Sequence, residues 1–109
     1  MLKDVFARRV ERGAALLDRV NPEWFRQVNV SCLNIKSNEW CVLGQVCGTY
    51  TKGLIETGLG NNSNAVTYGF FIHLRSTALG SFLKKILLER NWKKMIRSRL
   101  SATPFVGVL

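Results

Sequence analysis

Apolar residues recur at steps of three and four along the first twenty residues, and this spacing constrains the fold more than any other feature of the chain. They lie on one side of a helix that turns by about 100° per residue. The set is Leu2, Val5, Phe6, Val10, Gly13, Leu16, Leu17 and Val20. Charged residues occupy the other side, where Asp4 and Arg8 form a helix-supporting pair. We therefore predict an amphipathic helix over residues 2–20, which needs further elements to cover its apolar face.

The stretch "NPEW" predicts where this helix ends. A residue that precedes proline disfavours the helical region, so Asn21 should end the first helix. We expect Asn21 to cap a short second helix with Pro22 at its first position, followed by a connecting segment over residues 29–37. The core-facing side chains of this region are then Trp24, Phe25, Val28, Cys32, Leu33 and Ile35.

Residues 41–56, "CVLGQVCGTYTKGLIE", fit one further helix better than a strand. Its apolar face would consist of Val42, Leu43, Val46, Cys47, Tyr50 and Leu54. Gly44 and Gly48 lack side chains, so we expect them to let another helix pack closely against this one. Gly58 and Gly60 then end the helix, and Asn64 caps a short turn that closes at Gly69.

The three cysteines, Cys32, Cys41 and Cys47, invite a metal or nucleophile hypothesis together with the only histidine, His73. Zinc ligands in proteins usually come in pairs two to four residues apart, and these do not. A six-residue step also places Cys41 and Cys47 about 120° apart on a helix. We therefore expect structural thiols, no metal, no cofactor and no catalytic residue.

Three stretches in this order, "RGAALLDRVNPEW", "CVLGQVCGTYTKGLIETGL" and "AVTYGF", resemble a group of small uncharacterised proteins of actinobacteria and their bacteriophages. The resemblance covers residues 12–70, a little over half the chain. The resemblance implies an origin in actinobacteria or their bacteriophages, and it implies no activity or cofactor. The basic C-terminal part departs from the pattern of that group.

The C-terminal segment carries two different apolar faces. The first face is formed by Leu79, Phe82, Leu83, Ile86 and Leu87. The second is formed by Leu88, Trp92, Met95, Ile96 and Leu100, and it is rotated by roughly 140° from the first. One helix cannot bury both faces on the same side. We expect either a bend near Asn91, or a first half that packs on the core while the second half packs on a partner.

Positive charge concentrates in the same segment. The chain has a net charge of +9, and residues 75–99 hold eight basic residues against one acidic residue. Arg90, Lys93, Lys94 and Arg97 fall within about a 100° arc opposite the second apolar face. Such a field favours an acidic partner, either nucleic acid or an acidic protein surface.

From these features we predict a small all-α bundle of four to five helices, with a single domain over residues 1–100 and a tail over 101–109. No apolar run is long enough for a membrane span or a signal peptide, so we expect a cytoplasmic protein of the host cell. We expect a non-enzymatic accessory protein of a bacteriophage or mobile element. It would bind nucleic acid through Arg90, Lys93, Lys94 and Arg97. The alternative is docking on a host protein through Trp92, Met95, Ile96 and Leu100, and self-association stays open.

Overall fold

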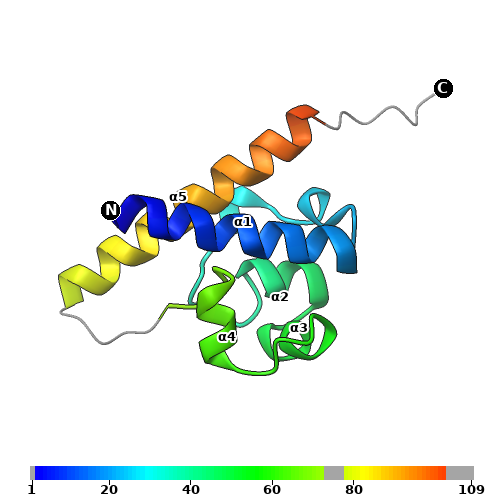
Figure 1. The fold of residues 1–109 in the computed structure, drawn as a ribbon, viewed down its shortest axis with the longest axis horizontal. Helices are drawn as coiled ribbons and strands as arrows, with labels where there is room; N and C mark the ends of the chain where they lie inside the picture. Colours follow the sequence, from blue (N-terminus) through cyan, green and yellow to red (C-terminus); the bar gives the residue numbers. More distant parts are fainter. Residues whose placement is uncertain (1, 73–77, 103–109) are drawn as a thin grey trace.

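The computed structural model describes residues 2–72 and 78–102, with the backbone alone for Leu2, Lys3 and Ala78. Within these residues every regular element is helical, which confirms the all-α prediction (Figure 1). The α-helices are α1 (Leu2–Val20), α2 (Val42–Cys47), α3 (Tyr50–Glu56), α4 (Asn62–Thr67) and α5 (Ala78–Ala102). Two short 3₁₀ helices, η1 (Trp24–Arg26) and η2 (Val30–Cys32), lie between α1 and α2.

The long helices α1 and α5 pack against each other and cross obliquely, and the three short helices lie together on one side of this pair, where α2 packs mainly on α3 (Figure 1). Trp92 of α5 is fully buried where these parts meet. Its ring stacks on Phe70 at 5.3 Å between centroids and meets Trp24 edge-on at 5.8 Å. Its indole N–H donates to the carbonyl of Gly69 at 2.6 Å. One tryptophan thus joins four segments that are distant in the sequence, because Gly13 of α1 also lies against its ring.

The turn after α1 differs in detail from the prediction. The first helix does end at Val20, but Asn21 and Pro22 form a turn in which the Trp24 amide donates to the Asn21 carbonyl at 2.8 Å. The short second helix is a single 3₁₀ turn that begins at Trp24, with Glu23 before it. The prediction that the short second helix begins at Pro22 is therefore wrong, whereas the predicted burial of Trp24 and Phe25 is confirmed.

The connecting segment contains one 3₁₀ turn, η2, and the Asn29 side chain caps it by accepting a hydrogen bond from the Ser31 amide at 3.0 Å. Leu33 and Ile35 are buried as predicted. Cys32 is exposed, so its placement in the core is wrong. It is the last residue of η2, and the backbone becomes extended at the next residue, Leu33.

The region 41–56 is two helices, and the prediction of one continuous helix is wrong. Gly48 adopts φ +104° and ends α2, and the Thr49 side chain then caps α3. Gly48 is exposed, and among the described residues a Cβ placed there would meet only the Cδ atom of the Lys52 side chain of α3, at 4.0 Å, so Gly48 is not a site of close helix packing. Gly44 is buried against the backbone of Asn38 and Glu39, so its close neighbour is a loop. The close approach of two helices occurs at Gly53 of α3, which lies against Leu43 of α2.

Glycines end the next two segments as the sequence indicates. Gly58, Gly60 and Gly69 all have positive φ, between +77° and +79°. The helix between them is α4, but its N-cap is Asn61 rather than Asn64. The Asn61 side chain accepts from the Asn64 amide at 2.8 Å, so the predicted cap is the residue that donates. None of the helices in the described ranges has the length and apolarity to cross a membrane.

Candidate nucleic-acid interface

Helix α5 runs without interruption from Ala78 to Ala102, through Asn91 (Figure 1). Its second half packs on the core, where Leu88, Trp92 and Ile96 are at most 1% exposed. Its first half leaves an apolar face in solvent. This arrangement is the reverse of the second of the two predicted alternatives, in which the first half packs on the core and the second half packs on a partner. The cause is Trp92, whose cavity is built by segments elsewhere in the sequence.

The four residues predicted to dock on a host protein, Trp92, Met95, Ile96 and Leu100, therefore lie mainly in the interior. Trp92 and Ile96 are fully buried, and Met95 is packed against the core. Only Leu100 keeps a large exposed fraction, 40%. These four residues do not form an accessible docking surface. The prediction that they anchor the chain on a host protein is therefore wrong, because Trp92 and Ile96 lie in the core.

The basic residues lie on the outer side of α5. Arg90, Lys93 and Arg97 line one open, shallow groove of about 330 Å³ between side chains of α5 itself, together with Ile86 and Glu89. They come to one groove because they are spaced by three and four residues. The sequence therefore brings three of the four predicted nucleic-acid contacts together.

Lys94 lies apart from that groove. It lines a smaller hollow of about 170 Å³ between α1 and α5, where Glu11 and Met95 are among its neighbours. Lys94 is exposed, so it adds to the positive field around α5, but it faces a different recess.

Two cations of α5 are engaged in ion pairs. Lys85 pairs with Glu89 at 2.8 Å, and Arg99 pairs with Asp18 of α1 at 2.7 Å. Asp18 also accepts from the Trp24 indole N–H at 2.9 Å. The ion pairs found within residues 2–72 and 78–102 leave Arg90, Lys93, Lys94 and Arg97 without an acidic partner. Their charge is available to an external anion.

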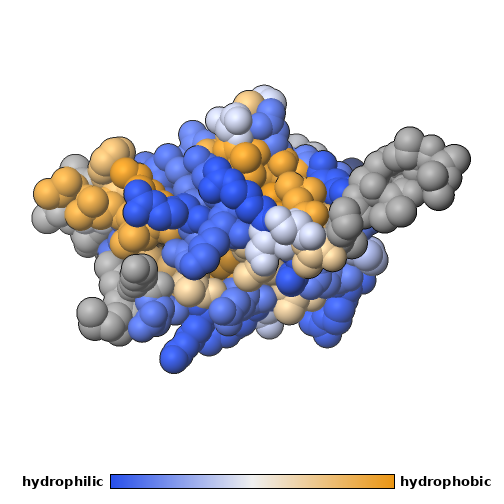
Figure 2. All heavy atoms as spheres, turned by 90° about the horizontal axis from the view of Figure 1, so that it is seen from above, coloured by the Kyte–Doolittle hydropathy of each residue, from blue (hydrophilic) through white to orange (hydrophobic). Residues whose placement is uncertain are grey.

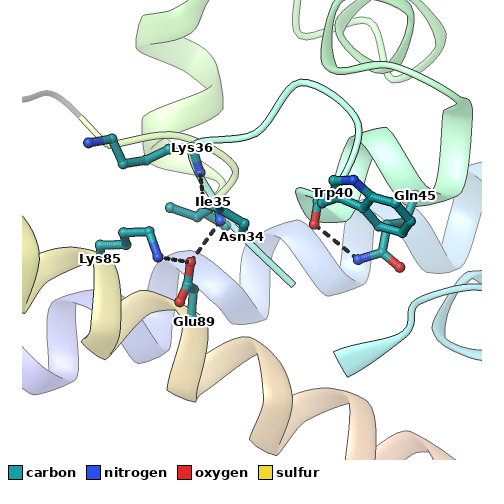
Figure 3. A network of polar contacts seen from close by, with 7 residues as sticks. All are labelled: Asn34, Ile35, Lys36, Trp40, Gln45, Lys85 and Glu89. Carbon is teal, nitrogen blue, oxygen red and sulfur yellow. Dashed lines mark hydrogen bonds and ion pairs between the residues drawn. The ribbon is translucent and has the colours of Figure 1, made fainter. Parts of the chain in front are cut away.

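Glu89 is the only acidic residue of α5, and its charge is satisfied inside the protein. One carboxylate oxygen, Oε2, accepts from the Ile35 amide at 2.8 Å and pairs with Lys85 (Figure 3). The side chain thus ties the segment after η2 to α5. Because Lys85 compensates its charge, Glu89 does not turn the groove into an acidic one.

We expect Glu89→Ala to lower the free energy of unfolding by about 1 to 3 kcal/mol, because the buried Ile35 amide loses its acceptor. Lys85→Ala is the matched variant. It removes the cation of the same contact, whose side chain is 25% exposed, and leaves the Ile35 hydrogen bond in place, so it should cost less than Glu89→Ala. Urea denaturation of the two variants measures the difference. Equal losses would show that the Ile35 hydrogen bond adds little.

The buried cysteines serve structure. The Cys41 sulfur caps α2 by accepting from the Gly44 amide at 3.2 Å, and burial raises the pKa of its thiol. Burial and the nearby Glu56 carboxylate raise the pKa of the Cys47 thiol to about 11. Both thiols are therefore protonated at neutral pH, which makes them poor nucleophiles. His73 lies outside the described residues, and within them no three potential metal ligands come together.

An exposed apolar patch on α5 was missed by the sequence reasoning. Leu79, Phe82 and Leu83 are 68%, 56% and 49% exposed. Apolar residues gather at the end of the molecule where α5 begins (Figure 2). The 140° rotation between the two faces of this helix was the available signal, since it required one face to stay uncovered.

Comparisons of this chain with protein-family models, with curated proteins and with solved structures find no match.

Proposed function

We propose that this chain is a non-enzymatic accessory protein of bacteriophage or mobile-element type, which binds nucleic acid in the host cytoplasm. The resemblance of residues 12–70 to small proteins of actinobacteria and their phages supports the provenance. The observation that carries the binding proposal is the open groove on α5, where Arg90, Lys93 and Arg97 meet without an acidic partner.

Phosphate groups suit this groove for an electrostatic reason. Three cations that are spaced along about 10 Å of helix can neutralise several phosphates of one backbone. Two of them, Arg90 and Arg97, carry guanidinium groups, which bind phosphate oxygens in a bidentate way. The one carboxylate at the groove, Glu89, is held by Lys85 and the Ile35 amide.

The docking alternative loses its support, because its anchors Trp92 and Ile96 are core residues. A nucleophilic role for Cys41 and Cys47 is disfavoured, because burial raises the pKa of both thiols. Nucleic-acid binding through the basic side of α5 is the function that the geometry favours.

The test is a salt titration of binding to a labelled oligonucleotide, followed by fluorescence anisotropy. We expect log K to fall linearly with log salt concentration, because bound phosphates release counterions. The triple variant Arg90→Ala, Lys93→Ala, Arg97→Ala should reduce the slope by about two to three units. Circular dichroism confirms that the variant stays folded, as expected for changes on the outer side of the helix.

The matched control is Arg8→Ala, Arg19→Ala, Lys52→Ala, which removes three positive charges from exposed positions outside α5. It should keep nearly the wild-type slope. If both triple variants reduce the salt slope by the same amount, binding depends on the net charge of the protein alone. The groove would then have no special role. Binding that ignores salt and the groove residues would contradict the proposal.

A further inference from the structure

The exposed apolar patch and the basic groove lie on the same side of α5. Counted at about 100° per residue, Leu79, Phe82, Leu83 and Ile86 fall within the arc of about 100° that also contains the groove cations. We call this continuous surface the outer stripe. Its apolar part precedes Arg90, and its basic part is Arg90, Lys93 and Arg97. Ile86 joins the two parts, because it lines the groove itself.

We propose that the outer stripe binds single-stranded nucleic acid, with Phe82 stacking on a base while the basic part holds the phosphates. This inference rests on the proposed function and names the form of nucleic acid that the site takes. Phe82 is 56% exposed, so its ring is available to a ligand. Bases stack on exposed aromatic side chains with little regard to sequence, whereas cations follow the backbone.

The composition of the stripe favours a single strand over a duplex. A duplex presents phosphates along its surface and keeps its base faces inside. Seated on the whole stripe, it would place phosphates against Leu79 and Phe82, and the described residues of the stripe include no cation there to replace the hydration of the phosphates. A single strand can turn its bases toward the apolar part and its phosphates toward the basic part. Phe82 and Arg90 are about 12 Å apart along the helix, so one short strand can reach both.

Charge complementarity also argues for an anionic occupant. The acidic residue of α5, Glu89, is buried and paired, so every exposed charge on this helix is positive. A second copy of the chain would bring the same excess of positive charge to the stripe. The apolar part alone amounts to two turns of one helix, which is small for a stable dimer interface.

The experiment compares binding of a 20-nucleotide single strand and of its duplex to the intact protein, at one salt concentration. We expect tighter binding of the single strand. Phe82→Leu is the decisive variant, because it keeps an apolar side chain and removes the ring. It should weaken single-strand binding by about 5- to 150-fold and leave the salt slope unchanged. Phe82→Trp should retain binding, and its fluorescence should change when the strand is added and not with the duplex.

The outcomes separate this inference from the proposed function. Equal or tighter duplex binding that depends on the groove cations but not on Phe82 overturns the inference and keeps the proposed function. If no nucleic-acid binding depends on the groove cations, both the inference and the proposed function are overturned. Concentration-dependent self-association that Phe82→Asp abolishes would assign the apolar part to a second copy. Binding to phosphatidylserine vesicles with no single-strand binding would assign it to lipid. Either result overturns the inference.

Discussion

Trp92→Ala should lower the free energy of unfolding by about 3 to 5 kcal/mol. The substitution removes the ring that lies between Phe70, Trp24 and Gly13, and it leaves a cavity that these neighbours cannot fill. It also deprives the buried Gly69 carbonyl of the indole N–H. In a chain of this size the melting temperature should fall by roughly 12 to 25 °C. Thermal and urea denaturation followed by circular dichroism measure both effects.

The matched control is Phe82→Ala on the same helix. Phe82 is exposed, so its truncation should change the free energy of unfolding by less than about 1 kcal/mol. The comparison distinguishes a core aromatic from a surface aromatic. If Trp92→Ala melts like the wild type and fails only in a binding assay, then Trp92 is a surface anchor and the packing described for α5 is wrong.

Gly13→Ala should lower the free energy of unfolding by about 2 to 3 kcal/mol, although alanine is the better helix former. A Cβ at position 13 would collide with the Tyr68 carbonyl and lie 2.9 Å from the Trp92 ring. Neither neighbour can yield easily, because one is backbone and the other is a buried ring. The two long helices and the segment after α4 would have to separate.

Ala15→Gly in the same helix is the control for helix propensity. Ala15 is exposed, so this change should cost about 1 kcal/mol through propensity alone. Helix propensity by itself predicts that Gly13→Ala raises the free energy of unfolding by a similar amount. A stabilised Gly13→Ala variant would therefore mean that α1 does not approach Trp92 as closely as the structure places it.

The sequence by itself determined the helices with long apolar periodicity and the points where the backbone must turn. Helix α1 has the predicted bounds, and Gly58, Gly60 and Gly69 have the left-handed backbone that their positions require. These features are local, since periodicity and turn chemistry depend on neighbouring residues. The basic side of α5 was also readable, because the spacing of Arg90, Lys93 and Arg97 fixes their common direction.

A helical pattern does not show where a helix is interrupted by a turn. The residues around Gly48 keep an apolar spacing that suits one helix, yet Gly48 ends α2 and Thr49 begins α3. The turn lets α3 fold back so that Gly53 meets Leu43. This contact lies between residues ten apart, and its packing energy is not visible in the local pattern.

Only the tertiary structure decided which apolar face of α5 is covered. Both faces are equally good on a helix wheel, and the sequence required just one of them to remain outside. The choice depends on Trp92, whose space is shaped by Gly13, Trp24 and Phe70. Burying this large ring, with its N–H satisfied by Gly69, stabilises the fold more than covering Leu79 and Leu83 would. The first half of the helix consequently keeps its apolar residues in solvent, on the same side of α5 as the cations of the groove.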